Sequence, residues 1–287
     1  MVTPNQRREA VSHLVDVFGV SERQACRVVG QHRSTQRHCR KTRSDAELVA
    51  RIRTIATIYP RYGYRRCHVI LLREGWEVNR KRVQRLWRQE NLHVKRRKRR
   101  KKVRGRSTGR VIAAFPDHVW SMDFVFDETA DGRPIKILNV QDDFTRENLA
   151  CWPARTITAE GTLRILDDVR AERGCSPFFL RMDNGPEFIA QVTKDWCHEV
   201  GTNTAYIDPG SPWQNGHCES FNDKLRDELL NLEIFDSMWE VRTMLQDRRH
   251  SYNHYRPHSS LSYLTPVEFA EKWRHENALL TSQAVDR

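Results

Sequence analysis

Apolar residues recur at helical spacing near the start of the chain. Residues 5–18 predict one helix, which Gly19 ends, and Ser21 begins a capping-box pattern for a second helix, Glu22–Val29. The inward positions of the first helix are Ala10, Val11, Leu14, Val15 and Phe18. Two helices joined by a glycine turn predict an N-terminal helix-turn-helix over residues 1–44, although many helical hairpins bind no DNA.

A second group of helices is predicted over residues 45–93. The helices are Asp45–Ile58, a segment that begins near Tyr62, and Arg80–Asn91 capped by Asn79. The basic face of the last helix holds Arg80, Lys81, Arg82, Arg85 and Arg88. A solvated helix face can have this composition. However, these side chains are the types that bind phosphates and guanine edges, so we predict a second helix-turn-helix-like module that contacts DNA.

A block of basic residues follows these helices. Between Lys95 and Arg110, eleven of sixteen residues are Lys or Arg, and no apolar periodicity is present. Such a block predicts a linker over residues 94–112 that follows a phosphate backbone. The residues assigned to DNA contact are Lys95, Arg96, Arg97, Lys98, Arg99, Arg100, Lys101 and Lys102. A nuclear-localisation signal has the same composition.

Short apolar runs then alternate with helical periodicity, which predicts an α/β domain over residues 113–235. The predicted strands are His118–Phe126, Ile135–Gln141, Leu149–Ala154, Phe178–Asp183 and Thr202–Ile207. Helices are expected at Ala159–Arg173, Pro186–Val200 and from Gly216 onward, the last with a stripe of Phe221, Leu225, Leu229 and Leu232. Residues 236–287 predict a helical extension that braces this domain, with DNA contact by Arg256 and His258 as the alternative.

The charge of the chain is divided between its two parts. Residues 1–110 contain 31 Lys/Arg and 8 Asp/Glu, whereas residues 111–287 contain 18 and 29, so +23 is followed by −11. The first part therefore suits a polyanion, and nucleic acid is favoured over an anionic membrane. No apolar run has the length of a transmembrane helix, no signal peptide opens the chain, and no Walker A motif implies ATP.

Cysteine and histidine give little sign of a structural site. The seven cysteines include no Cys-x-x-Cys pair, so reduced thiols are expected. A zinc module of the His₂Cys₂ type is an alternative, but His32, His38 and Cys39 lack a second pair of ligands.

Three carboxylates have contexts that favour a metal site. Asp123 interrupts the apolar run Val119–Phe126, Asp183 ends a predicted strand before an Asn-Gly turn, and Glu219 lies early in a predicted helix. With 37 acidic residues in the chain, spacing alone proves little. A carboxylate in mid-strand is costly to bury without a cation, however, and oxygen-only ligands suit Mg²⁺.

These residues lie in motifs that resemble a known family. The motifs are Trp120-x-x-Asp123, Asp183-Asn184-Gly185-Pro186-Glu187-Phe188 and Ser211-Pro212-x-x-Asn215-Gly216-x-x-Glu219-Ser220. They resemble the DDE transposases of the "insertion-sequence three" family, whose cores are similar to retroviral integrases. The 35 residues between Asp183 and Glu219 match that family's spacing. The resemblance covers nearly the whole chain, and its bacterial source argues against a nuclear-localisation signal.

The resemblance implies a fold and a chemistry. The fold is a ribonuclease H-like α/β domain, a five-stranded mixed sheet with helices, preceded by all-α helix-turn-helix modules. Its first and fourth strands would lie side by side, so that Asp123 and Asp183 meet. With Glu219 these acids would hold two Mg²⁺ ions, for which Mn²⁺ substitutes, with Asp123 bridging both. Arg226, seven residues after Glu219, would bind phosphate, and Asn215 and Lys224 are assigned to DNA contact.

The resemblance also implies partners. The substrates would be the terminal inverted repeats of a mobile element and a target duplex. The chain would self-associate on DNA in the bacterial cytoplasm, at the nucleoid, and an upstream-frame product is a possible partner. Two alternatives stay open: a nuclease of the same fold that only hydrolyses DNA, and a DNA-binding regulator whose acidic triad is vestigial.

Overall fold

A computed structural model describes residues 3–38, 44–94, 111–182, 191–206 and 215–285. Contacts divide the chain into two units, Met1–Arg51 and Ile52–Arg287, and each is considered by itself. None of the described helices is long and apolar enough to span a membrane.

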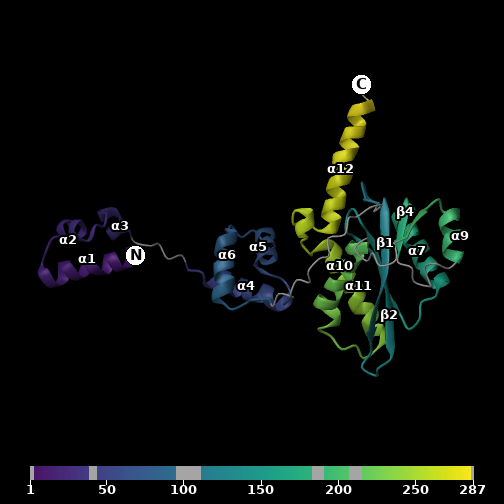
Figure 1. Ribbon diagram of the computed structural model, residues 1–287, viewed down its shortest axis with the longest axis horizontal. Helices are drawn as coiled ribbons and strands as arrows, with labels where there is room; N and C mark the ends of the chain where they lie inside the picture. Colours follow the sequence, from purple (N-terminus) through teal and green to yellow (C-terminus); the bar gives the residue numbers. More distant parts are fainter. Residues whose placement is uncertain (1–2, 39–43, 95–110, 183–190, 207–214, 286–287) are drawn as a thin grey trace. The chain divides into compact units, whose positions relative to one another are not determined.

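The first unit contains the predicted helical hairpin (Figure 1). Its helices are α1 (Pro4–Phe18), α2 (Glu22–Val29) and the short α3 (Arg33–Arg37), which the sequence pattern did not predict. The hydroxyl of Ser21 caps α2 by accepting from the Gln24 N–H. Gly19 has a φ of 63°, a left-handed conformation that glycine adopts without steric cost, so α1 ends there.

Three more helices precede the sheet. They are α4 (Ala46–Ile58), α5 (Tyr64–Arg73) and α6 (Arg80–Gln89). The side chain of Asn79 caps α6 by accepting from the Lys81 N–H at 2.8 Å, as its sequence position predicts. Their buried side chains in the second unit are Ile52, Ile55, Cys67, Leu71, Val83, Leu86 and Trp87. The apolar face of α6 is therefore buried, which leaves its basic face outward.

The second unit contains one five-stranded mixed sheet. Its strands are β1 (Val119–Glu128), β2 (Pro134–Asp142), β3 (Asn148–Ala154), β4 (Phe179–Met182) and β5 (Asn203–Tyr206). The order is β3-β2-β1-β4-β5, with β1, β2 and β3 antiparallel and β4 and β5 parallel to β1. This is the ribonuclease H-like arrangement, and the expected adjacency of the first and fourth strands is confirmed.

Helices cover both faces of this sheet (Figure 1). On one face lie α7 (Ala159–Arg173) and α9 (Gln191–Glu199). The other elements are α10 (Gly216–Leu225), the π-helical turn η2 (Arg226–Leu230), α11 (Met238–His254), the 3₁₀ turn η3 (Ser259–Leu261) and α12 (Pro266–Val285). Of these, α10 packs on β1 and β2, and α11 packs on β3.

The two faces of the sheet differ in polarity because side chains alternate along a strand. Trp120, Met122 and Leu138 belong to the apolar core beneath α7 and α9. The opposite face is apolar at one end only, where Val125, Ile135 and Ile137 join Phe221 and Leu225 of α10 in a second core. Toward the other end it carries the buried polar residues Ser121, Asn139, Gln141, Asp143 and Arg181. We call this row the polar face.

The predicted stripe of the last core helix is wrong at its final position. Leu232 is 42% exposed, whereas Leu230 is 7% exposed and takes the place in the core. The cause is that the helical segment ends at Leu230, with Asn231 as its C-cap, so Leu232 lies in the turn beyond it. In the last helical turn the Asn231 N–H donates to the Arg226 carbonyl at 2.8 Å, five residues back, which is the hydrogen bond of a π turn.

The C-terminal residues brace the core, as the sequence predicts, and the alternative of DNA contact is not supported by their burial. Arg256 is 1% exposed and His258 is 4% exposed. The guanidinium of Arg256 donates to Glu228 at 2.5 Å, and Arg248 donates to the same carboxylate at 2.5 Å. Arg66 lies 4.0 Å from the same carboxylate, so three cations compensate one largely buried acid.

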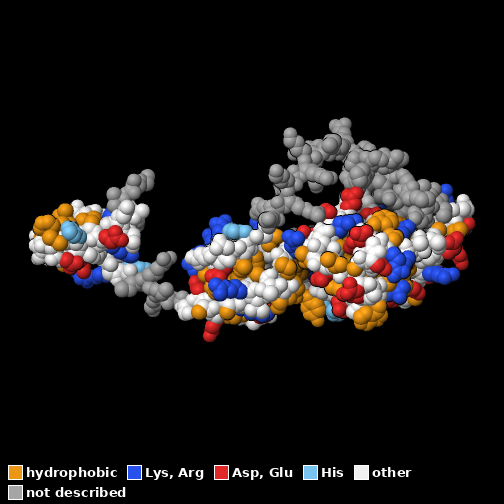
Figure 2. Space-filling view, turned by 90° about the horizontal axis from the view of Figure 1, so that it is seen from below, with side chains coloured by type: hydrophobic (Ala, Val, Ile, Leu, Met, Phe, Trp, Pro, Cys, Tyr) orange, Lys and Arg blue, Asp and Glu red, His pale blue; other side chains and the backbone are white. Residues whose placement is uncertain are grey.

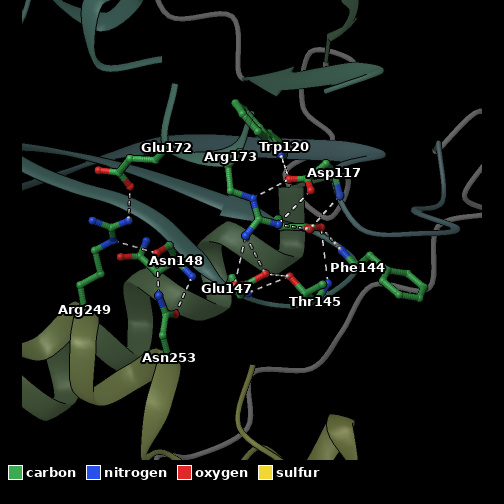
Figure 3. Close-up of polar contacts among 11 residues, drawn as sticks. Asp117, Trp120, Phe144, Thr145, Glu147, Asn148, Glu172, Arg173, Arg249 and Asn253 are labelled. Carbon is green, nitrogen blue, oxygen red and sulfur yellow. Dashed lines mark hydrogen bonds and ion pairs between the residues drawn. The ribbon is translucent and has the colours of Figure 1, made fainter. Parts of the chain in front are cut away.

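A second buried network joins α7 to the start of β1 (Figure 3). Arg173 donates to Asp117 at 2.9 Å and to Glu147 at 3.1 Å, and it lies 3.9 Å from Asp142. Burial raises the pKa of Asp142 to about 6, although backbone N–H donors from Asp117 and Phe144 oppose that rise. One guanidinium thus compensates three carboxyl groups.

We expect Arg173→Met to destabilise the protein by about 3–5 kcal/mol at pH 8, because it leaves buried acids without their cation. The folded-state pKa of Asp142 exceeds its ordinary value of 3.8, so the stability linked to this group is present below about pH 4 and is lost as pH rises through about 6. The loss caused by Arg173→Met should therefore be smaller at pH 5 than at pH 8. Denaturant unfolding at both pH values measures it.

The control variant is Arg249→Met. Its ion pair with Glu172 is partly exposed, with side-chain exposures of 34% and 62%, so its loss should be smaller and nearly independent of pH. If Arg173→Met lowered the free energy of unfolding equally at pH 5 and pH 8, the unpaired carboxyl groups of this network would not be the cause of the loss.

Candidate active site

Asp123 lies in the middle of β1, on the polar face and opposite Asn139 of β2. Two donors fix its carboxylate: the Phe124 N–H donates to Oδ1 and the Asn222 side-chain amide donates to Oδ2, both at 2.8 Å. Hydrogen bonds to a carboxylate favour its charged form. These two hydrogen bonds therefore stabilise the charged form of a half-buried acid in mid-strand, partly without a metal.

A relay of two amides orients Asn222. The amide nitrogen of Asn139 donates to Oδ1 of Asn222 at 2.8 Å. Asn139 is fully buried and Asn222 is 7% exposed. Because Oδ1 of Asn222 accepts from β2, its nitrogen faces Asp123, and the relay links β2, α10 and β1. The sequence placed Asn222 on the same helix face as Glu219, but it did not reveal this bond.

Glu219 lies in the first turn of α10, three residues before Asn222. Residues three apart are neighbours on a helix surface, so the bond from Asn222 to Asp123 brings Glu219 to the same part of the sheet. Glu219 is exposed on the outer side of α10. Partial burial, and then the negative charge of Asp223, raises its pKa. A nearby cation would relieve both effects.

Asn215 anchors the start of α10. It is 4% exposed, and its amide nitrogen donates to the Met122 carbonyl at 3.3 Å, next to Asp123. Its Oδ1 is buried and has no hydrogen-bond partner among the described residues. An unsatisfied buried oxygen calls for a donor or a cation.

The donor set fits a hard divalent cation. Asp123 and Glu219 offer only oxygen ligands, which hard divalent cations prefer. Asp183, the third predicted acid, lies outside the described residues. Within the part of the chain that is described, no group of three or more His, Cys, Asp or Glu is suited to hold a metal.

Arg226 and Lys224 have different surroundings. Arg226 is the first residue of η2. Its guanidinium donates to the Phe126 carbonyl at 3.2 Å, and Phe126 lies on β1, the strand that also carries Asp123. Lys224 lies instead near Arg256 and Glu228. There burial, and then the charge of Arg256, lower the pKa of Lys224 to about 7. Its assignment to DNA contact stays a prediction.

The other predicted DNA contacts precede the sheet in the sequence. Arg80, Lys81, Arg85 and Arg88 are exposed on α6, whereas Arg82 is half-buried. The residues Lys95, Arg96, Arg97, Lys98, Arg99, Arg100, Lys101 and Lys102 lie outside the described residues. On the face of the sheet-containing part seen in Figure 2, Lys and Arg are interspersed with Asp and Glu.

Family comparisons match most of the chain. Two integrase core domain families match residues 113–212 and 200–266, and an HTH-like domain family matches residues 43–100. The first two ranges contain all three predicted acids, and the third contains α6.

Relatives from bacterial insertion elements match nearly the full length. A protein of insertion element IS476 from Xanthomonas euvesicatoria is 38% identical over 96% of this chain and 80% of its own length. A protein of insertion element IS407 from Burkholderia multivorans is 39% identical over 92% of this chain and 95% of its own length. The transposase InsD of IS2 from Escherichia coli is 28% identical over 78% of each chain.

Solved integrase cores are similar to about half of this chain. The catalytic core of HTLV-2 integrase in complex with magnesium covers 54% of this chain and 97% of that chain, with 16% identity and a TM-score of 0.42. The core of BIV integrase covers 56% and 99%, with 20% identity and a TM-score of 0.43.

The IS476 and IS407 relatives share more than 30% identity with this chain over most of their length, and the integrase core families match the sheet and its flanking helices. The chain therefore belongs to the insertion-element transposase family, whose integrase core is a DDE-type polynucleotidyl transferase.

Proposed function

We propose that this transposase nicks the ends of its mobile element and joins them to target DNA in a magnesium-dependent reaction. The observation that carries the proposal is the bond from Asn222 to Asp123. It ties the helix that carries Glu219 to the strand that carries Asp123. This bond supports a joint role for two acids that come from separate elements.

The register of the sheet supports Asp183 as the third acid. Val119, Trp120 and Ser121 of β1 pair with Phe179, Leu180 and Arg181 of β4, a constant offset of 60 residues. Asp123 and Asp183 continue the same offset. Asp123 comes two positions after Ser121, and Asp183 comes two positions after Arg181, the last pair of this register. Along a strand, residues two positions apart have side chains on the same face.

Asp123, Asp183 and Glu219 would hold two Mg²⁺ ions, with Asp123 shared and Mn²⁺ as a substitute. When bound, the pair of ions would activate the attacking oxygen and stabilise the leaving oxygen of an in-line displacement. The protein's own contribution is to fix the carboxylates. Asn222 and the Phe124 N–H hold both oxygens of Asp123, so little reorientation is needed when DNA binds.

Arg226 would position the DNA phosphate. Its bond to the Phe126 carbonyl keeps the guanidinium beside β1, and Arg226 forms no ion pair with any described residue. A guanidinium has five N–H donors, so it can bind a phosphate as well as a backbone carbonyl. Asn215, which precedes α10, would lie near the same DNA.

The N-terminal part would bind the element ends. We assign residues 1–44 and 45–93 to two helix-turn-helix modules, 94–112 to a basic linker, 113–235 to the catalytic core and 236–287 to a helical extension. The exposed basic face of α6 would read bases, and the linker would follow phosphates. Self-association on DNA, an upstream-frame partner and a place at the bacterial nucleoid complete the proposal.

Replacement of either acid should abolish catalysis while DNA binding persists. We expect Asp123→Asn and Glu219→Gln to stop nicking of element-end DNA in Mg²⁺, because each removes a charged metal ligand, while the Kd for the same DNA changes little. Single-turnover nicking and a binding titration measure the two effects.

Glu128→Gln serves as the matched control for this pair. Glu128 is an exposed acid on the same strand, so its replacement should keep nicking at the wild-type rate. Nicking by Asp123→Asn near the wild-type rate would exclude the metal role of the triad. Nicking without joining by the wild-type protein would instead indicate a nuclease.

Replacement of Arg226 should slow the reaction without preventing metal binding. We expect Arg226→Ala to lower nicking and joining by up to about 100-fold, since small misplacements of substrate cost that much. Arg226→Lys should recover part of the rate, because an ammonium keeps the charge but not the planar fork. Single-turnover rates at saturating Mg²⁺ measure this, and a wild-type rate for Arg226→Ala would leave Arg226 only its structural bond to Phe126.

Sequence-specific and sequence-independent DNA binding should respond to different substitutions. Neutralising several residues of Lys95–Lys102 should weaken binding to all duplexes alike and reduce the salt dependence by about 0.9 in slope for each phosphate that the variant no longer binds. Arg85→Ala should instead cost about 1–3 kcal/mol of discrimination between an element end and random DNA. The measurement is the Kd of each variant for both duplexes over a range of salt concentrations. If every variant lost affinity for the element end and for random DNA in parallel, α6 would read no bases.

A further inference from the structure

A buried ion pair lies on the polar face, close to Asp123. Arg181 of β4 donates to the carboxylate of Asp143, which directly follows β2. The two side chains are 3% and 2% exposed. The hydroxyl of Ser121, on β1, donates to the other oxygen of Asp143 at 2.7 Å. Three neighbouring strands therefore meet at one carboxylate.

The strand register places this group beside the catalytic position. Ser121 pairs with Arg181 across β1 and β4, and Ser121 and Asp123 share the polar face because they are two residues apart. Asp143 continues β2 alongside β1, where its N–H donates to the Val119 carbonyl at 2.9 Å. The ion pair thus crosses β1 one side-chain row before Asp123.

Stability gives little reason for a buried ion pair here. Desolvation of two charges offsets most of their attraction, and apolar residues of similar size usually stabilise a protein as well or better. The opposite face of the same strands shows that solution, with Trp120, Leu180 and Met182 in the apolar core. What an ion pair adds is direction, because charged hydrogen bonds fix angles and distances that apolar contacts leave loose.

Arg181 also contacts a third part of the chain. A second guanidinium nitrogen donates to the Val111 carbonyl, at the first described residue after the basic segment. One guanidinium group thus binds both Asp143 and the Val111 carbonyl. These two contacts fix the carboxyl end of β4, which stops at Met182.

We propose that Ser121, Asp143 and Arg181 form a positioning group that sets the register and separation of β1 and β4 beside Asp123. The inference rests on the proposed function, because the position of Asp123 relative to the end of β4 matters only if Asp123 acts together with Asp183, which follows β4 in the sequence. None of the three residues touches substrate in this scheme. They act through β1, which carries Asp123, and through the end of β4.

The test replaces both charges together in the full-length protein, as Asp143→Leu with Arg181→Met, so that neither charge of this pair remains without the other. We expect the unfolding midpoint to stay near the wild-type value. The affinity for Mn²⁺, measured by calorimetry without DNA, should fall about 10-fold or more, as for the loss of outer-shell support of metal ligands. Single-turnover nicking at saturating Mg²⁺ should fall about 10- to 100-fold. Wild-type Mn²⁺ affinity and nicking rate in this folded variant would overturn the proposal.

Arg173→Met is the control for destabilisation. It disturbs a buried network of α7 and the start of β1, so it should lower the unfolding midpoint and leave the Mn²⁺ affinity of the folded protein unchanged. A loss of Mn²⁺ affinity in Arg173→Met equal to that of the double variant would also overturn the proposal, because general loosening would then explain both.

Ser121→Ala keeps the proposal testable if the double variant does not fold. It leaves the ion pair intact and removes one bond to Asp143, so a smaller fall in Mn²⁺ affinity and nicking rate is expected. Unchanged values in Ser121→Ala, with the double variant unfolded, would overturn the positioning role. Asp123→Asn separates the two proposals. If it abolishes nicking while the positioning variants react normally, only this inference fails, and if it nicks normally, the proposed function itself fails.

Discussion

The requirement to hold a charged carboxylate in the middle of a strand governs this structure. Asp123 would be costly on a buried sheet, and the chain meets that cost with a backbone N–H and the amide of Asn222. Asn222 can donate in the right direction because Asn139 fills its other side. This bond adds to the packing of Phe221 and Leu225 in fixing α10, and with it Glu219, against the sheet.

The sheet is asymmetric for the same reason. One face is a continuous apolar core. The other must change from apolar to polar along its strands, with Asp123 and Asn139 at the boundary. The buried polar residues beyond that boundary bond with one another and with α11, as Gln141 does with the hydroxyl of Tyr252 at 3.1 Å. A polar interior of this kind is stable only when its groups find partners.

Local patterns in the sequence predicted most of the elements, because alternation, capping and glycine turns act over a few residues. The helix Ala159–Arg173 and the hairpin around Gly19 agree with the structure. The strand order was not visible in those patterns. It came from the family resemblance, because pairing of β1 with β4 joins residues 60 apart. The candidate acids were found by their contexts, but the relay through Asn139 and the ion pair of Arg181 depend on tertiary contacts that no local pattern contains.

The π turn η2 affects how relatives should be compared with this chain. It absorbs one residue between Arg226 and Leu230, between the helix that carries Glu219 and the buried acid Glu228. A relative with an uninterrupted α-helix would need one residue fewer to place the same two acids in space. An alignment without a gap would then match Glu219 correctly and shift the positions that follow the π turn. Structural equivalence beyond Leu225 is therefore better judged from the core side chains than from residue counts.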